Sequence, residues 1–409
     1  MYPVLEGLRV IEASSFIAAP SCGLHLSQLG AEILRVDQIR GGLDYRRWPL
    51  APSGASLYWE GLNKGKKSVG LNLRSREGRD LLCSLATTPG ANAGILLTNY
   101  PSDSFLSYAA LKKLREDIIV LRIIGRSDGT SAVDYTVNSV YGIPYMTGPA
   151  SLGDAPVNHV LPAWDLLTGA YAAYCLLAAL HHRNRHGIGQ EIRVSLEDVA
   201  IASLGNIGSI ADSTLNGADR ARNGNDLYGA FGRDFETTDR RRVMVVAITE
   251  KQWSALLGAL GVNDAVHQLE EELDVSFGVD EGLRYTHRDR LYPIVEKAIK
   301  ARAYADVAKN FNEAGVCWGP YRTLSESISA EPALSEANPM LSLVTHRSGQ
   351  RYLTPGAAAT FDGLERRAPG SAPDLGEHTS EVLSGLLRLS GEEIAALRDR
   401  GVIDGPKAK

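Results

Sequence analysis

Short apolar runs alternate with helix-like segments over the first 125 residues of the chain. The apolar runs are rich in Val, Ile and Leu and have the length of buried strands. We predict strands at residues 8–12, 32–36, 68–73, 94–98 and 118–123, and helices at 22–29, 77–86 and 111–116. Because strands and helices alternate, the pattern predicts an α/β fold with a doubly wound parallel sheet covered by helices on both faces.

A long apolar segment rich in small residues begins just after residue 160 and continues to residue 180. A basic cluster at 181–186 and a glycine turn follow, and then a predicted strand at 191–196. One carboxylate, Asp165, stands at the start of this predicted helix. Asp is a favoured N-cap residue, so Asp165 is either a helix cap or a reactive group. The helix macrodipole would favour its ionised form by about 0.3–1 kcal/mol.

The character of the sequence changes near residue 224, where a polar, glycine-containing region precedes a strong β run at 242–249. Helices are predicted at 251–260, 287–301 and 304–314, and two more at 379–387 and 391–401. We therefore divide the chain into residues 1–223, the first part of a large α/β domain, a smaller α+β domain at 224–323, and the segment 324–409.

Composition narrows the functional classes. The formal charge of −5, from 43 basic and 48 acidic residues, is too mild to indicate a nucleic acid or a membrane as partner. The four cysteines lie far apart, and the histidines show no ligand spacing on one helix face, so no disulfide framework and no metal site are expected. No signal peptide is apparent, and the most apolar run, 166–180, is short for a membrane span. These features predict a cytoplasmic protein.

Several familiar motifs are missing. No G-x-G-x-x-G follows the first predicted strand, and no P-loop or G-x-S-x-G elbow occurs, which counts against NAD or ATP enzymes and α/β-hydrolases. Lys64, Lys66 and Lys67 precede the strand at 68–73, and Arg74 follows it. Such a basic run is either a solvated face or a grip on a phosphate-bearing ligand.

Six ordered segments, at 5–37, 61–73, 98–101, 163–190, 315–323 and 375–383, resemble the class III coenzyme A transferases over nearly the whole chain. The resemblance implies that Asp165 attacks an acyl-CoA thioester, with coenzyme A as part of the substrate and no permanently bound cofactor. It also implies an interlocked, ring-like homodimer, and a large domain to which residues 324–409 return. By position, CoA contacts are expected from Ala18, Lys64, Leu71, Asn72, Leu73, Arg74, Asn99, Tyr100, Val133 and Asp134.

Two departures from the family pattern narrow the expected reaction. Racemases of the family carry a catalytic His where this chain has Val133, so epimerisation, which needs two acid–base groups, is disfavoured. The segment 228–239 lacks the glycine run of the formyl-CoA transferases. The segments at 41–49, 131–148, 158–165 and 228–239 resemble a branch of the family that moves CoA between the C1 and C4 carboxylates of mesaconate.

A retained diacid needs cationic or hydrogen-bonding partners, and the candidates in these segments are Arg46, Arg47, Tyr141, Tyr145, His159 and Arg233. Two alternatives stay open on the sequence. The chain could transfer CoA between an acyl-CoA and a separate small dicarboxylic acid. It could also be a catalytically silent CoA-binding protein in which Asp165 is only a helix cap.

Overall fold

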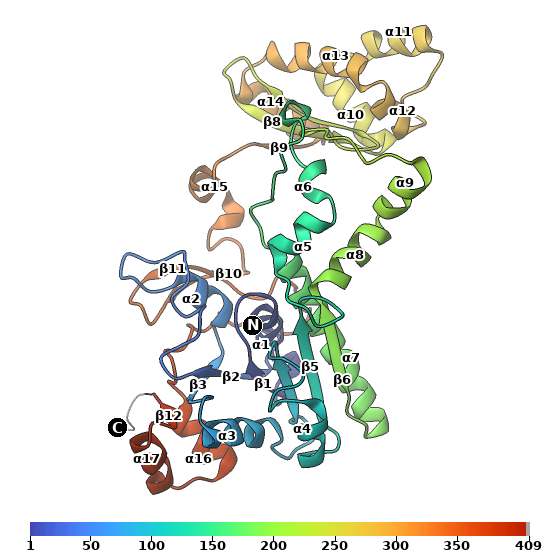
Figure 1. Ribbon diagram of the computed structural model, residues 1–409. Coiled ribbons are helices and arrows are strands. Elements are labelled where there is room, and N and C mark those ends of the chain that lie inside the picture. The colour runs from blue at the N-terminus through green and yellow to red at the C-terminus, as the bar shows by residue number, and fades with distance from the viewer. Residues whose placement is uncertain (406–409) are drawn as a thin grey trace. The chain divides into compact units, whose positions relative to one another are not determined.

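The computed structural model describes residues 1–405, whose helices and strands are drawn in Figure 1. The described chain divides into two compact units. Unit 1 contains Met1–Tyr141, Val160–Ala211 and the chain from Pro332 onward, and unit 2 contains Gly142–His159 and Asp212–Glu331. Both ends of the described chain therefore belong to unit 1. The domain boundaries at 223 and 323 stay a prediction.

Unit 1 is built on a seven-stranded sheet with the order β12-β3-β2-β1-β4-β5-β6. All neighbouring strands run parallel except the edge strand β12, which is antiparallel to β3. The predicted α/β fold with a parallel sheet is thus confirmed, and the predicted strands of this sheet lie within two residues of those observed. Its strands are β1 (Arg9–Ala13), β2 (Glu32–Gln38), β3 (Lys67–Leu71), β4 (Ile95–Thr98), β5 (Ile119–Ile124), β6 (Glu191–Ser195) and β12 (Ile403–Asp404).

Helices cover both faces of this sheet, since successive strand residues point to opposite sides and both sides are buried. One face shares a buried core with α3, α16 and α17, and α1 and α7 pack on the other. The helices of unit 1 are α1 (Ala18–Gln28), α2 (Leu57–Asn63), α3 (Arg76–Ala86), α4 (Tyr108–Leu114), α5 (Asp134–Val140), α7 (Ala163–His186), α8 (Leu196–Asn206), α16 (Thr379–Leu387) and α17 (Gly391–Asp399). A separate hairpin pairs β10 (Leu341–Thr345) with β11 (Arg351–Pro355).

Helix α7 packs against α1, β5 and β6. Helix α1 approaches α7 closely at Gly169, where an added Cβ would lie 2.7 Å from the carbonyl oxygen of Ala18 and 2.8 Å from Ser21 Cβ. With 24 residues, α7 is long and apolar enough to cross a membrane by length and composition alone, a criterion that core helices of soluble proteins also meet. The helix continues through the basic cluster and ends at Gly187, whose φ of 70° allows the left-handed cap.

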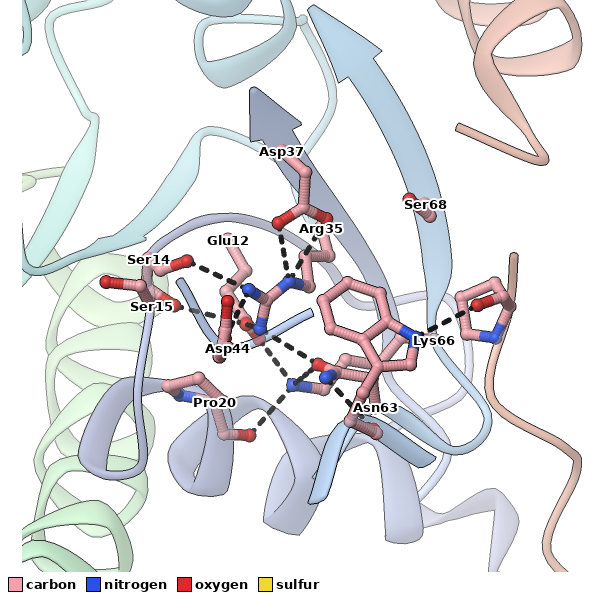
Figure 2. A network of polar contacts seen from close by, with 12 residues as sticks. Glu12, Ser14, Ser15, Pro20, Arg35, Asp37, Asp44, Asn63, Lys66 and Ser68 are labelled. Atoms are coloured by element: carbon pink, nitrogen blue, oxygen red, sulfur yellow. Dashed lines mark hydrogen bonds and ion pairs between the residues drawn. The ribbon is translucent and has the colours of Figure 1, made fainter. Parts of the chain in front are cut away.

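A buried network of ion pairs joins segments between residues 12 and 66 of unit 1 (Figure 2). The guanidinium of Arg35 on β2 contacts Asp44 at 2.7 Å, Asp37 at 3.1 Å and Glu12 at 3.3 Å. Lys66 contacts Glu12 at 2.9 Å. All five side chains are almost fully buried, and burial raises the pKa of Asp37 to about 6 even though Arg35 opposes the shift. Removing one partner would leave a buried charge uncompensated, so this network fixes the segments it joins.

The same network reaches three further positions of unit 1. Asn63 Oδ1, at the end of α2, accepts hydrogen bonds from Arg35 at 3.0 Å and from Lys66 at 3.1 Å. Arg35 also donates to the carbonyl of Ser14, and Lys66 to that of Pro20 in α1. Because Asp44 belongs to the segment between β2 and α2, the network holds that segment against the sheet (Figure 2).

Unit 2 has its own core around a three-stranded antiparallel sheet of order β7-β8-β9. Phe231 and Phe235 on β7 pack against Trp253 and Tyr292 of the surrounding helices. The elements of this unit are α6 (Ile143–Met146), β7 (Phe231–Glu236), β8 (Arg242–Ala247), α10 (Glu250–Leu260), α11 (Asn263–Leu273), α12 (Glu281–Thr286), α13 (Arg288–Lys300), α14 (Tyr304–Ala314), β9 (Cys317–Pro320) and α15 (Leu324–Ala330). Helix α9 (Ser209–Asn216) crosses the boundary between the units.

The contact of α7 with α1 predicts that Gly169→Ala destabilises the protein, because the new methyl group would press on the backbone of α1. Overpacking of this kind costs about 1–3 kcal/mol. Gly385→Ala in α16 is the matched control. Among residues 1–405, apart from its chain neighbours and the backbone of its own helix turn, no atom lies within 4 Å of its Cβ position, so the change should be neutral or stabilise by up to ~1 kcal/mol. Urea denaturation measures both. Equal stability of the two variants would contradict the close approach.

Candidate active site

Asp165 lies in the first turn of α7 but does not cap that helix. The N-cap position is Pro162, which forms no side-chain cap, and Asp165 stands three residues further on. The exposed backbone amides of the turn are instead bound by Asp134. Its Oδ2 accepts hydrogen bonds from the N–H groups of Trp164 at 2.7 Å and Asp165 at 3.1 Å. The carboxylate of Asp165 is half-buried and is not used to complete the helix.

The pKa of Asp165 is raised from 3.8 to about 7. Burial is the main cause, the negative charge of Asp134 adds to it, and the positive charge of Arg47 opposes it. The helix macrodipole alone would lower the pKa of Asp165, but desolvation outweighs this effect of about 0.3–1 kcal/mol. Because the folded protein binds this proton more tightly than the unfolded chain does, its contribution to stability is lost as the pH rises from about 4 to about 7.

Arg47 reaches this region from the segment that Asp44 anchors. Its guanidinium lies 5.4 Å from the ring centre of Phe16 and 5.5 Å from that of Tyr58. Phe16 has a φ of 67°, an uncommon backbone conformation for a non-glycine residue, in the turn between β1 and α1. The neighbouring Arg46 lies elsewhere and lines a cavity of about 490 Å³ with Trp59 and other residues. The structure thus separates two arginines that the sequence placed together.

Three buried side-chain oxygens of this region have no hydrogen-bond partner among residues 1–405: Tyr58 Oη, Asp134 Oδ1 and Thr168 Oγ1. Burial raises the pKa of Tyr58, and the negative charge of Asp165 adds to the shift. Thr168 follows Asp165 by three residues and so lies on the same side of α7. Buried polar groups are nearly always paired, so unpaired ones indicate a place where a bound molecule would complete the contacts. Sequence inspection did not single out Phe16, which lies within the family-like segment 5–37, or Tyr58, which lies in none of the family-like segments.

The carboxyl ends of β1 and β4 meet beside α1. Strand order reverses between these two strands, and open α/β sheets bind ligands at such a reversal. Asn99, just after β4, accepts a hydrogen bond from the amide of Ser15 at 3.3 Å and donates to the Ser15 carbonyl at 3.0 Å. Ala18 begins α1 here, and burial raises the pKa of Tyr100. Three predicted CoA-contacting residues therefore share this edge of the sheet.

The other predicted CoA contacts on the sheet lie after β3. Leu71 is fully buried, and the next three residues form the turn into α3. Within that turn, Asn72 Oδ1 accepts from the amide of Arg74 at 3.2 Å, and Leu73 donates to Gln38 at 2.8 Å. The side chain of Arg74 is exposed.

The lysine run is not the solvated face considered above. Lys66 is buried in the ion network, and Lys67 bridges Glu32 and Glu381. Lys64 is buried as well, donates to the carbonyl of Gly61 at 2.6 Å, and has its pKa lowered to about 8, mainly by burial. Lys66 and Lys67 are therefore structural partners within unit 1, and Lys64 stays a predicted CoA contact.

The remaining predicted substrate residues fall in different places. Tyr141 is the C-cap of α5, and partial burial, followed by the hydrogen bond to Glu197, raises the pKa of its hydroxyl. Val133 precedes α5 and is exposed. Tyr145, His159 and Arg233 belong to unit 2. Arg233 lies 3.5 Å from Asp226 and 4.9 Å from the ring centre of Tyr292.

The histidines do not follow the predicted pattern. His182 and His186 are four residues apart near the end of α7, and their ring centres lie 4.6 Å apart, so a pair with ligand spacing does share a helix face. Within the described part of the chain, no group of three or more His, Cys, Asp or Glu side chains is arranged to hold a metal ion.

Comparison with known proteins assigns the family. The model of CoA-transferase family III matches residues 5–379. The chain is 46% identical to the 2-methylfumaryl-CoA isomerase of Chloroflexus aurantiacus, covering 99% of both chains. It is 26% identical to human succinyl-CoA:glutarate CoA-transferase, covering 98% of this chain and 90% of that one. A CAIB/BAIF family protein from Brucella suis has the same fold, with a TM-score of 0.74 at 23% identity over 94% of this chain and 100% of its own. This chain belongs to CoA-transferase family III.

Proposed function

We propose that this protein isomerises 2-methylfumaryl-CoA, also called mesaconyl-CoA, by moving coenzyme A between the C1 and C4 carboxylates. The main support is Asp165, a half-buried carboxylate that does not cap its helix and whose pKa is raised to about 7. The chain also belongs to the same family as the Chloroflexus isomerase. Near-neutral pKa values suit groups that must be ionised and reactive at physiological pH.

In the proposed reaction, a carboxylate oxygen of Asp165 attacks the C1 thioester carbon, and the CoA thiolate leaves. The product is a mixed aspartyl–mesaconyl anhydride. The thiolate then attacks the aspartyl carbonyl, giving an aspartyl–CoA thioester and free mesaconate. The C4 carboxylate attacks that thioester and releases the thiolate. Attack of the thiolate on C4 of the new anhydride forms the isomeric CoA ester and restores Asp165.

Retention of the diacid distinguishes isomerisation from transfer between two molecules. If mesaconate stays bound, its second attack is effectively unimolecular, which lowers the barrier by up to ~7–11 kcal/mol in well-oriented cases. Isotopically labelled free mesaconate or succinate, added during turnover, should therefore not enter the product CoA esters. Entry of the label would favour the intermolecular alternative.

We propose that the pantetheine and nucleotide of CoA follow the carboxyl edge of the sheet. Support comes from the reversal of strand order between β1 and β4, where three of the predicted residues gather. The proposed contacts are Ala18, Lys64, Leu71, Asn72, Leu73, Arg74, Asn99, Tyr100, Val133 and Asp134. The acyl end would then extend toward Asp165 on α7.

The diacid needs partners for its second carboxylate, and Arg47 is the best placed of the predicted candidates. Its guanidinium influences Asp165, and the unpaired hydroxyl of Tyr58 lies near the same aspartate. A charged hydrogen bond to a carboxylate contributes about 1.5–3 kcal/mol. Arg46, Tyr141, Tyr145, His159 and Arg233 stay candidates with weaker support.

We also propose that the protein is a homodimer. Large aromatic side chains remain exposed along α7, where Tyr171 is 51% and Tyr174 66% exposed. Such a face on a central helix is typical of a surface that another chain covers. A monomer mass in light scattering would contradict this assembly and the interlocked ring with it.

Replacing Asp165 with Asn should lower turnover by roughly 10⁴-fold or more, because an amide cannot form the anhydride. In the unaltered protein, kcat/KM should rise with pH through about 7, where Asp165 ionises to the attacking form. Chromatographic separation of the two CoA isomers measures both effects. Turnover retained in Asp165→Asn, or an acid limb near pH 4, would contradict the proposed nucleophile.

Arg47→Gln and Arg46→Gln form a matched pair of neighbouring substitutions. Loss of Arg47 should lower kcat/KM about 10- to 100-fold, since the diacid loses a charged partner. Its loss should also move the acid limb to higher pH, because Arg47 lowers the pKa of Asp165. Arg46→Gln should change kcat/KM less than about twofold. Equal effects of the two variants would show that the separation of these arginines has no functional meaning.

A further inference from the structure

Asp134 contacts the backbone that carries the reactive carboxylate. It is the first residue of α5, lies 31 positions before Asp165 in the sequence, and is only 2% exposed. One oxygen, Oδ2, accepts from two successive amides, those of Trp164 and Asp165. Because the N-cap residue Pro162 supplies no side-chain acceptor, this distant carboxylate satisfies amides that the helix leaves free.

A second contact from α5 fixes the same turn. Asn138, one helical turn after Asp134 and fully buried, accepts a hydrogen bond from the indole Nε1 of Trp164 at 3.1 Å. Helix α5 thus binds residue 164 through both its backbone and its side chain. Two contacts on different parts of one residue restrict rotation as well as translation, so the turn that carries Asp165 has one orientation relative to α5.

Asp134 also brings a like charge close to Asp165. The charged or titratable groups that act on Asp165 are Asp134 on α5 and Arg47 on the segment before α2, and the neutral phenol of Tyr58 on α2 is coupled to it. Asp134 opposes ionisation of Asp165, and Arg47 favours it. A carboxylate held beside a like charge is more basic, and a more basic carboxylate is a stronger nucleophile toward an acyl carbon.

We propose that Asp134 is a positioning residue for CoA transfer. It fixes the turn of α7 that carries Asp165, and its negative charge keeps the Asp165 carboxylate nucleophilic. This inference rests on the proposed role of Asp165. It gives Asp134 a function distinct from the CoA contact expected from its motif position. The hydrogen bonds from the amides of Trp164 and Asp165 to Oδ2 of Asp134 fix the turn. The other oxygen, Oδ1, has no hydrogen-bond partner within residues 1–405.

Two substitutions separate geometry from charge. Asp134→Asn keeps an oxygen that can accept from both amides but removes the charge, so the acid limb of kcat/KM should move to lower pH with little change in KM. Asp134→Ala removes both, so kcat should also fall about 10- to 100-fold through misplacement of the nucleophile. Asp128→Asn is the control: within residues 1–405 the side chain of this exposed residue of the preceding loop accepts hydrogen bonds from Thr130, so its replacement should leave the pH profile unchanged.

A measurement that needs no turnover tests the effect of Asp134 on Asp165 separately from the proposed isomerisation. The carboxyl stretching band that is lost in Asp165→Asn can be titrated by infrared difference spectroscopy in the unaltered protein and in Asp134→Asn. A titration that moves to lower pH in Asp134→Asn supports the inference, even if the protein failed to isomerise mesaconyl-CoA. An unchanged or higher titration midpoint in Asp134→Asn would overturn it, and so would an Asp134→Ala variant with unaltered kcat.

Discussion

The close packing of α7 on α1 determines where the candidate site lies. A glycine at position 169 brings the two helices within contact of backbone atoms, and the first turn of α7 is thereby placed beside the turn between β1 and α1. That turn is also where the strand order of the sheet reverses. A carboxylate on the first turn of α7 consequently stands next to the edge at which α/β sheets bind their ligands.

Burial and charge then decide what this carboxylate can do. A helix N-terminus favours an ionised acid, but Asp165 is desolvated and lies near Asp134, so its pKa rises to about 7. Ionisation of Asp165 therefore destabilises the folded protein. The buried contacts of α5 and of Arg35 nevertheless hold the surrounding segments in place. A reactive group whose ionisation destabilises the folded state is typical of functional sites, where local stability is sacrificed to chemistry.

The sequence predicted the sheet well because its strands are short, continuous apolar runs, and it predicted α7 from a long run of small apolar residues. It could not predict contacts between distant segments. Asp134 was predicted to contact CoA from its motif position, and no local pattern reveals that its side chain also accepts hydrogen bonds from a helix that begins 29 residues later. For Lys66 the sequence left open a solvated face or a phosphate contact, because no local pattern reveals that Glu12 and Asn63 bind it. Arg46 and Arg47 are indistinguishable in sequence, and only the fold of their segment separates them.

The proposed reaction requires the side-chain carboxyl group of Asp165 to be bound covalently during turnover, through an oxygen to the acyl group and then through its carbonyl carbon to the sulfur of CoA. Hydroxylamine added to the working enzyme converts such an activated carboxyl into a hydroxamate, which mass spectrometry of the digested protein locates. We expect a hydroxamate on the peptide that contains Asp165, formed only when mesaconyl-CoA is present. Isomer formation with that carboxyl unmodified, or modification at another residue, would contradict it.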